Sequence, residues 1–229
     1  MIRDGIFYCA GFIAAALVVA YLTAWGWAIP LLALAIFALY FFRNPRRVVP
    51  AAPGIIVSPA DGRVTHVDAP AADSPLGQEF AHRVSIFLSI FDVHVTRAPA
   101  AGRILSAQYR RGRFRSAMDP ASASENEQNL VHRAGGPGAQ PCLAFSQIAG
   151  LIARRIVFWP RPGDYVERGQ LVGLIKFGSR VEVFLPAGSE ITVAVGQRVQ
   201  AGASLLARLP PPLAATTHPA ADAHSRASA

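Results

Sequence analysis

Lysine is almost absent from this chain of 229 residues, and Lys176 is the only one. Chemistry that needs a lysine, such as binding of pyridoxal phosphate or attachment of biotin or lipoate, therefore has a single candidate. Lys176 ends an apolar run beside Phe177, whereas carrier lysines occupy exposed hairpin tips, and no glycine-rich phosphate-binding loop lies nearby. Both kinds of lysine-based function are disfavoured.

Cysteine and charged residues are also scarce. Cys9 and Cys142 are the only cysteines, and Cys9 lies in an apolar stretch, which argues against a disulfide scaffold and favours a reducing, cytoplasmic-side domain. Charged residues make up 16% of the chain, hydrophobic residues make up 52%, and the mean hydropathy is +0.32. These values predict a membrane segment. The net charge of +8 fits a polyanionic partner, either nucleic acid or an anionic lipid surface.

Two apolar runs, residues 6–23 and 29–42, lie near the N-terminus on either side of a break at 25–30. The first is about long enough to span a bilayer, and the second needs part of the break to do so. The arginines that flank the pair are Arg3, Arg43, Arg46 and Arg47. The positive-inside rule then places both ends in the cytoplasm, which predicts a membrane-anchoring helical hairpin in residues 1–45. An anchor that dips into one leaflet remains an alternative, and a cleavable signal peptide is disfavoured.

Beyond a linker marked by Pro45 and Pro50, the apolar pattern changes to that of strands. Runs rich in Val and Ile predict strands at 54–57, 63–67, 84–91, 104–114, 142–148, 151–158, 171–175 and 181–185. Residues 119–129 and 134–141 are predicted as loops. The run at 84–91 is apolar on both faces, so it is expected to be a buried strand that leads to Asp92 and His94.

A weak internal repeat relates residues 163–175 to residues 196–209, which share the form Gly-x-x-Val-x-x-Gly followed by an apolar segment. This form resembles the hammerhead segments of biotinyl and lipoyl carrier domains and of hybrid barrel-sandwich folds. We therefore expect residues 46–209 to form a mainly β (α+β) domain of barrel-sandwich-hybrid type with two related halves. Residues 210–229 have too little apolar surface to offset the entropy of ordering, so this tail is expected to be disordered.

A short connection, residues 177–180, joins the predicted strands at 171–175 and 181–185. A tight turn is one interpretation of it. Another is that the Gly178–Ser179 bond is strained, because glycine tolerates backbone angles that other residues avoid. The Ser179 hydroxyl would then attack the preceding carbonyl in an N-to-O acyl shift, and β-elimination would cut the chain and leave a pyruvoyl group at residue 179.

Four separated motifs carry a close resemblance to one family. They are VSPADG at 57–62, FDVHVTRAP at 91–99, QIAGLIARRI at 147–156 and FGSRVEVFLP at 177–186. In this order they resemble the short, bacterial-type phosphatidylserine decarboxylase proenzymes, which are pyruvoyl-dependent, and the resemblance runs from about residue 41 to about residue 209.

The resemblance implies self-cleavage between Gly178 and Ser179 into a larger subunit, residues 1–178, and a smaller one, residues 179–229. Ser179 would become a covalent pyruvoyl cofactor, and a Schiff base with the substrate amine would take up the electrons of the departing carboxylate. The expected reaction converts phosphatidylserine to phosphatidylethanolamine and CO2 at the cell membrane, with the catalytic domain on the cytoplasmic side. No metal is expected.

The resemblance also implies a catalytic set of Asp61, His94 and Ser179, in which His94 takes the serine proton and Asp61 fixes its tautomer. From the residues alone, Asp61 could be only a turn-former. Arg97, Arg154 and Arg155 are the substrate-binding candidates, and adjacent residues of a strand face opposite ways, so at most one of the last two enters the site. Longer relatives carry His-x-x-His where this chain has His94 and Arg97, which leaves open which base drives self-cleavage.

The expected partners are phosphatidylserine and anionic membrane lipid. Basic residues in the strand pattern at 103–115 could face lipid phosphates, and nucleic acid is disfavoured because stacking aromatic residues and a nucleic-acid-binding module are missing. A higher oligomer stays possible. Two other functions remain open: decarboxylation of a related serine phospholipid, and a non-catalytic membrane-tethered carrier or binding module of biotinyl or lipoyl type.

Overall fold

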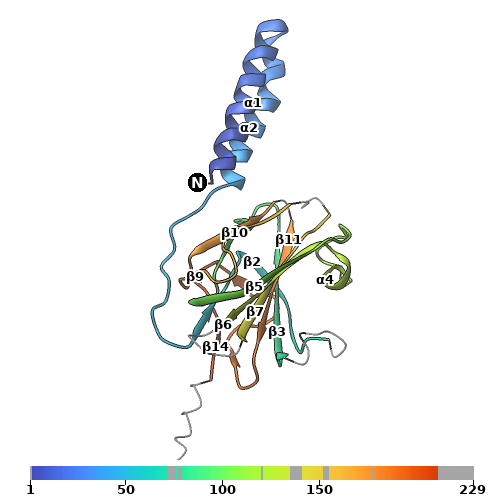
Figure 1. The fold of residues 1–229 in the computed structure, drawn as a ribbon. Helices are drawn as coiled ribbons and strands as arrows, with labels where there is room; N and C mark the ends of the chain where they lie inside the picture. Colours follow the sequence, from blue (N-terminus) through green and yellow to red (C-terminus); the bar gives the residue numbers. More distant parts are fainter. Residues whose placement is uncertain are drawn as a thin grey trace, which may run out of the picture.

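A helical hairpin stands on one end of a β domain in the computed structural model of this protein (Figure 1). The structure describes residues 2–71, 76, 79–119, 121–134, 141–151, 155–176 and 178–210. The predicted fold class, mainly β with an N-terminal apolar helical segment, is confirmed.

The hairpin consists of α1 (Arg3–Leu22), the 3-10 turn η1 (Trp25–Ala28) and α2 (Ile29–Phe41). Helix α1 has a mean hydropathy of 2.2 and is the only helix of the described residues that is long and apolar enough to cross a membrane. Its 20 residues correspond to about 30 Å of helix, which matches a bilayer core. Large apolar side chains are exposed along both helices, as expected of a surface that faces lipid.

Fourteen strands follow the linker within the described part of the chain. They are β1 (Ile55–Val57), β2 (Gly62–Asp68), β3 (His82–Leu88), β4 (Val95–Arg97), β5 (Gly102–Arg110), β6 (Gln128–Ala134), β7 (Pro141–Ile148), β8 (Ile156–Phe158), β9 (Tyr165–Val166), β10 (Leu171–Ile175), β11 (Ser179–Leu185), β12 (Glu190–Ile191), β13 (Arg198–Val199) and β14 (Leu205–Arg208), with a short helix α4 (Ser122–Glu125) before β6. Eight of them form one sheet in the order β13-β2-β3-β11-β7-β6-β5-β9.

The remaining strands form two three-stranded sheets that match each other in register. Their orders are β1-β14-β12 and β4-β10-β8. Val57 pairs with Leu205 in the first sheet and Arg97 pairs with Leu171 in the second, and each sheet has a register shift next to this pair. The two sheets are therefore equivalent elements of a duplicated unit.

The turns of the predicted repeat are equivalent as well. The backbone angle φ is 97° at Gly163 and 90° at Gly196, and it is 75° at both Gly169 and Gly202. These angles lie in the left-handed region that favours glycine, which explains why glycine recurs at this spacing. The predicted pair of related halves is confirmed.

Reciprocal backbone hydrogen bonds join the two halves. The Val57 N–H donates to the Pro99 carbonyl at 2.9 Å, and the Arg97 N–H donates to the Pro59 carbonyl at 2.8 Å. The duplication thus extends to the segments around β1–β2 and β4–β5, which the sequence pattern did not reveal.

Several predicted strands differ at their ends. Strand β3 stops at Leu88 rather than at Phe91, because the Asp92 carboxylate accepts hydrogen bonds from the Ser89 N–H at 2.8 Å and the Ser89 hydroxyl at 2.7 Å and so closes a turn. Strand β11 begins at Ser179, two residues earlier than predicted. Strand β6 and helix α4 were not predicted.

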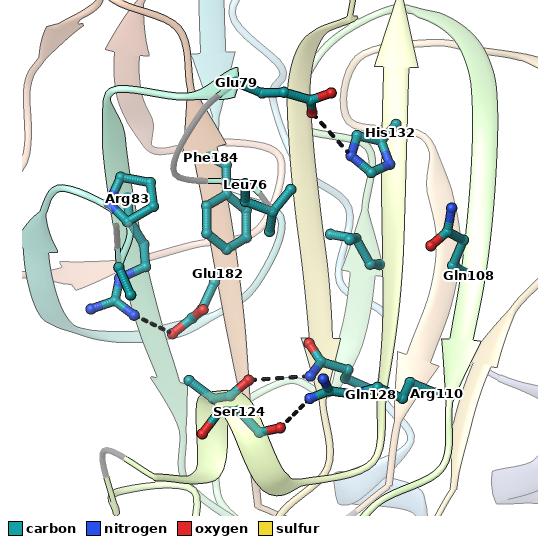
Figure 2. Close-up of a pocket in the computed structure, with 14 residues that line it drawn as sticks. Leu76, Glu79, Arg83, Gln108, Arg110, Ser124, Gln128, His132, Glu182 and Phe184 are labelled. Atoms are coloured by element: carbon teal, nitrogen blue, oxygen red, sulfur yellow. Dashed lines mark hydrogen bonds and ion pairs between the residues drawn. The ribbon is translucent and has the colours of Figure 1, made fainter. Parts of the chain in front are cut away.

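The two faces of β11 lie in different surroundings. Ser179, Val181 and Val183 alternate toward the hydrophobic core, whereas Glu182 and Phe184 line a cavity of about 580 Å³ on the outer face of the large sheet (Figure 2). In Figure 2 the two acidic side chains of this cavity each have a partner: Arg83 lies 3.7 Å from Glu182, and His132 lies 3.5 Å from Glu79. The cavity therefore lies on the face of the sheet opposite the Ser179 side chain.

Candidate active site

One end of the eight-stranded sheet gathers the predicted site. Ser179 pairs with Leu88 of β3, and the next residue, Arg180, pairs with Ile148 of β7. The loops that follow β3 and β7 therefore meet at the start of β11. The hairpin stands over the same end of the domain in Figure 1.

Gly178 and Ser179 occupy a closely packed position. Gly178 has φ of 62°, in the left-handed region, and Ser179 is 0% exposed. A Cβ added to Gly150 would lie 2.2 Å from the Gly178 carbonyl oxygen, so a glycine is required there for the two loops to approach. The Ser179 hydroxyl is buried without a hydrogen-bond partner among the described residues. An unpartnered buried hydroxyl is costly for folding, and the Ser122 hydroxyl is buried in the same way, so a functional role for Ser179 depends on its neighbours as well. Phe177, the other residue of the predicted turn, lies outside the described residues.

His94 contacts Gly178, the residue before this serine. Its Nε2 accepts a hydrogen bond from the Gly178 N–H at 3.1 Å, and its Nδ1 lies 2.9 Å from the Asp92 carbonyl oxygen. An acceptor at Nε2 and a donor at Nδ1 define one neutral tautomer. Burial lowers the pKa of His94 from 6.5 to about 4, so the imidazole is neutral at pH 7 and can act as a base.

The hairpin covers His94 directly. The ring of Phe41, the last residue of α2, lies 4.2 Å from the imidazole ring, measured between centroids, and Phe41 is 1% exposed. This contact is one cause of the burial that keeps the histidine uncharged. The hairpin is thus one wall of the candidate site.

Asp61 lies near this end of the domain but makes other contacts. Its carboxylate accepts hydrogen bonds from Arg47 at 2.7 Å and from the Ala201 N–H at 2.8 Å. Burial raises its pKa despite these two donors. Among the described residues no hydrogen bond joins Asp61 to His94, whose Nδ1 faces the Asp92 carbonyl. The structure therefore places His94 against Gly178, the residue before Ser179, and places Asp61 beside the linker.

The duplication shows that the fold does not require an aspartate at position 61. Asp61 precedes Gly62 of β2, which pairs with β13, and Ala101 precedes Gly102 of β5, which pairs with β9 in the same way. The equivalent turn thus forms with an alanine. This comparison favours a functional role for Asp61 over that of a turn-former.

The three candidate arginines differ in their surroundings. Arg97 donates to the Gly169 carbonyl at 2.8 Å and to the Asn44 Oδ1 at 2.6 Å, so its guanidinium holds the linker to the domain. Arg154 lies outside the described residues. Arg155 is exposed, its carbonyl accepts a hydrogen bond from the Lys176 N–H at 3.2 Å, and its guanidinium has no partner in the described part of the chain. Of the candidates the structure describes, only Arg155 has a guanidinium available for a ligand.

Lys176 is tied to the anchor. Its Nζ lies 2.7 Å from a carboxylate oxygen of Asp4 in α1, and the rings of Tyr8 and Phe42 lie within 5.5 Å of it. The residue is 7% exposed. A carrier lysine must instead be accessible to its ligase and partners, so this burial weighs against a biotinyl or lipoyl attachment site.

The phosphatidylserine decarboxylase family model matches residues 34–207. The chain belongs to this family. A phosphatidylserine decarboxylase proenzyme of Solibacter usitatus is 49% identical over 208 residues, which cover 91% of this chain and 96% of the relative. One of Nitrosomonas europaea is 44% identical over 206 residues, which cover 90% of this chain and 93% of the relative. One of Symbiobacterium thermophilum is 44% identical over 200 residues, which cover 87% of this chain and 92% of the relative.

As a phosphatidylserine decarboxylase family member, the chain has site contacts that the sequence reasoning missed. Asp4, Phe41 and Arg47 belong to the anchor or linker, yet they contact Lys176, His94 and Asp61. The sequence offered little indication of these contacts, because the charged residues beside the apolar runs were interpreted only as markers of membrane orientation. No group of three or more His, Cys, Asp or Glu side chains among the described residues is arranged to hold a metal ion.

Proposed function

We propose that this chain is a membrane-attached, pyruvoyl-dependent phosphatidylserine decarboxylase that processes itself at Gly178–Ser179. The observation that carries the proposal is the contact between neutral His94 and the Gly178 N–H, one residue from a buried, unpartnered serine hydroxyl. This contact supports a base close to the nucleophile, because His94 touches the residue that precedes Ser179.

Processing begins when His94 takes the Ser179 hydroxyl proton and the oxygen attacks the Gly178 carbonyl carbon. The amide becomes an ester, and the amino group of Ser179 is freed. Loss of the Ser179 Cα proton then expels the Gly178 carboxylate by β-elimination. The resulting dehydroalanine takes up water and releases ammonia, which leaves a pyruvoyl group at the start of residues 179–229. In this account Asp61, held by Arg47, supports the base electrostatically.

The surroundings of residue 179 fit a pyruvoyl group. Once formed, the group supplies a carbonyl for the serine amine and a sink for the electrons of the departing carboxylate. Leu88 flanks position 179 on the core side, and its burial keeps water away. His94 would return a proton to the carbon that loses CO2, and Arg155 would bind the substrate phosphate or carboxylate.

The anchor fits a substrate whose acyl chains stay in the bilayer. We propose that the hairpin of residues 1–45 inserts into the cell membrane, with the domain of residues 46–209 on the cytoplasmic side because Arg43, Arg46 and Arg47 follow the hairpin. Anionic lipid would attract this basic chain. The account is the same for an anchor that spans the membrane and for one that enters a single leaflet.

The test is release of CO2 from phosphatidylserine by the purified full-length chain in mixed micelles. Borohydride added with the substrate should fix the lipid to the fragment that begins at residue 179 and abolish turnover. A Ser179→Ala chain should show neither turnover nor adduct. Turnover by the Ser179→Ala chain, or turnover without any adduct on the smaller fragment, would contradict the proposal.

The same assay separates the remaining alternatives. A serine phospholipid with ether-linked chains, assayed beside the diacyl lipid, shows which one is turned over faster. A carrier or binding module would give no CO2 from either substrate. Burial of Lys176 already weighs against the carrier function.

A further inference from the structure

Three large apolar side chains are exposed on separate loops around Gly178. Phe91 is 63% exposed, Met118 65% and Leu151 62%. They lie between β3 and β4, between β5 and α4, and between β7 and β8. Exposed apolar side chains that share one region mark a surface that contacts another apolar body.

The strand register places these loops at the same end of the large sheet. Phe91 follows Leu88, which pairs with Ser179, and Leu151 follows Ile148, which pairs with Arg180. Met118 lies in the loop that follows β5. The last residue of β5, Arg110, pairs with Gln128 of β6, and Gln128 pairs with Ile148 of β7. The three side chains therefore surround the start of β11.

Direct contacts make this surface continuous with the hairpin and the cleavage site. The Phe91 carbonyl accepts hydrogen bonds from the Tyr40 hydroxyl at 3.1 Å and from Arg43 at 2.8 Å. Gly150, next to Leu151, packs against the Gly178 carbonyl, and a Cβ at Gly150 would lie 3.3 Å from the Ala117 Cβ, next to Met118. The exposed side chains thus extend the apolar surface of the hairpin to the loops around Gly178.

We propose that Phe91, Met118 and Leu151 form a rim that enters the interfacial layer of the bilayer that holds the hairpin. This inference depends on the membrane attachment described under the proposed function. Arg111 and Arg113 are exposed on the same loop as Met118, and basic side chains beside apolar ones suit the head groups of an anionic membrane. With the rim inserted, the loops around residue 179 lie at the level of the lipid head groups while the acyl chains stay among their neighbours.

The test uses the full-length chain with both native cysteines removed, C9A and C142A, and one new cysteine at a time. M118C and L151C are labelled with an environment-sensitive fluorophore and reconstituted into phosphatidylcholine–phosphatidylglycerol bilayers that contain a lipid with a nitroxide near the top of its acyl chain. L105C is the matched control, because Leu105 is 42% exposed on the part of β5 that pairs with the far end of β6.

The rim predicts strong nitroxide quenching at M118C and L151C and little at L105C. Equal, weak quenching at all three positions overturns it. This readout does not depend on turnover, so a chain that is quenched as expected but releases no CO2 would refute the proposed function and leave the rim standing. A second arm uses F91S/M118S/L151S, which should keep its activity on a short-chain, micellar phosphatidylserine and lose about tenfold on vesicles.

Discussion

His94 is held in its neutral form by burial, and this has a consequence for pH dependence. Its pKa is 6.5 in an unfolded chain and about 4 in the folded one. Between these two values the unfolded chain binds a proton that the folded chain does not, so the free energy of unfolding falls as the pH falls from 6.5 to 4. The difference is on the order of 3 kcal/mol. Urea titrations of the uncut S179A chain at several pH values measure this pH dependence of the free energy of unfolding. Adding His94→Gln should remove most of the pH dependence, whereas adding His82→Gln should leave it unchanged.

The same residue sets the pH profile of processing. Because the base stays neutral to low pH, self-cleavage should proceed at a constant rate at neutral pH and slow only as the pH approaches 4. His94→Gln should slow cleavage by about a hundredfold or more, because a general base is lost. Gel analysis of freshly purified or translated protein measures both. A profile that bends near pH 6.5 would show that the base is not buried His94.

Arg155 offers a test of substrate binding at a single side chain. Arg155 is exposed and its carbonyl accepts a hydrogen bond from the Lys176 N–H, close to the proposed cleavage loop. Arg155→Gln should therefore raise KM for phosphatidylserine about tenfold while kcat changes little. Arg161→Gln, at an exposed arginine in the β8–β9 loop, is the matched control. Equal KM values for the two variants would remove Arg155 from the site.

At the scale of elements, the base of the hairpin contacts the strand connection that contains the proposed cleavage site. Helix α1 holds the β10–β11 connection through the 2.7 Å ion pair of Asp4 with Lys176. Asp4→Asn should therefore slow processing about threefold to tenfold, since the connection is less firmly placed. Asp4→Glu should restore most of the rate, and Glu190→Gln, a change at an exposed acid near Arg208, should have no effect. A normal rate in Asp4→Asn, measured by gel, would show that the ion pair is dispensable.

The sequence predicted some elements well and others poorly for physical reasons. Runs such as Leu171–Ile175 are apolar and bounded by glycine, so the strand pattern was clear. Strand β6 was missed because Asn129, His132 and Arg133 interrupt its apolar pattern, although Asn129 and Arg133 are buried. Their polar groups find partners only after folding, as in the 3.2 Å hydrogen bond between Asn129 and Gln147.

The site was predicted in the same uneven way. The motifs predicted His94 and Ser179 as site residues, and the structure places His94 in contact with Gly178, the residue before Ser179. The link between His94 and Asp61 stays a prediction, because a motif gives no information on which carboxylate a histidine faces. Contacts such as Phe41 on His94 join residues far apart in the chain, and no spacing rule predicts them.

At the scale of the whole molecule, cleavage should leave the two fragments together. Strand β11 lies between β3 and β7, and β14 pairs with β1, so the smaller fragment contributes strands to the core of the larger one. All seven residues of β11 are buried. Native mass spectrometry in detergent should show one particle with the summed mass of both fragments, and denaturation should separate them. Dissociation without denaturant would contradict the shared core.

The measurement that bears most directly on the whole account is the intact mass of the purified wild-type chain under denaturing conditions. The account predicts one fragment that ends at Gly178 and a second that begins at residue 179 and is lighter than the unmodified peptide by one molecule of ammonia. The S179A chain should give a single mass for the uncut polypeptide. A single full-length mass for the wild type, with an unmodified serine at residue 179, would contradict self-processing and with it the proposed enzyme.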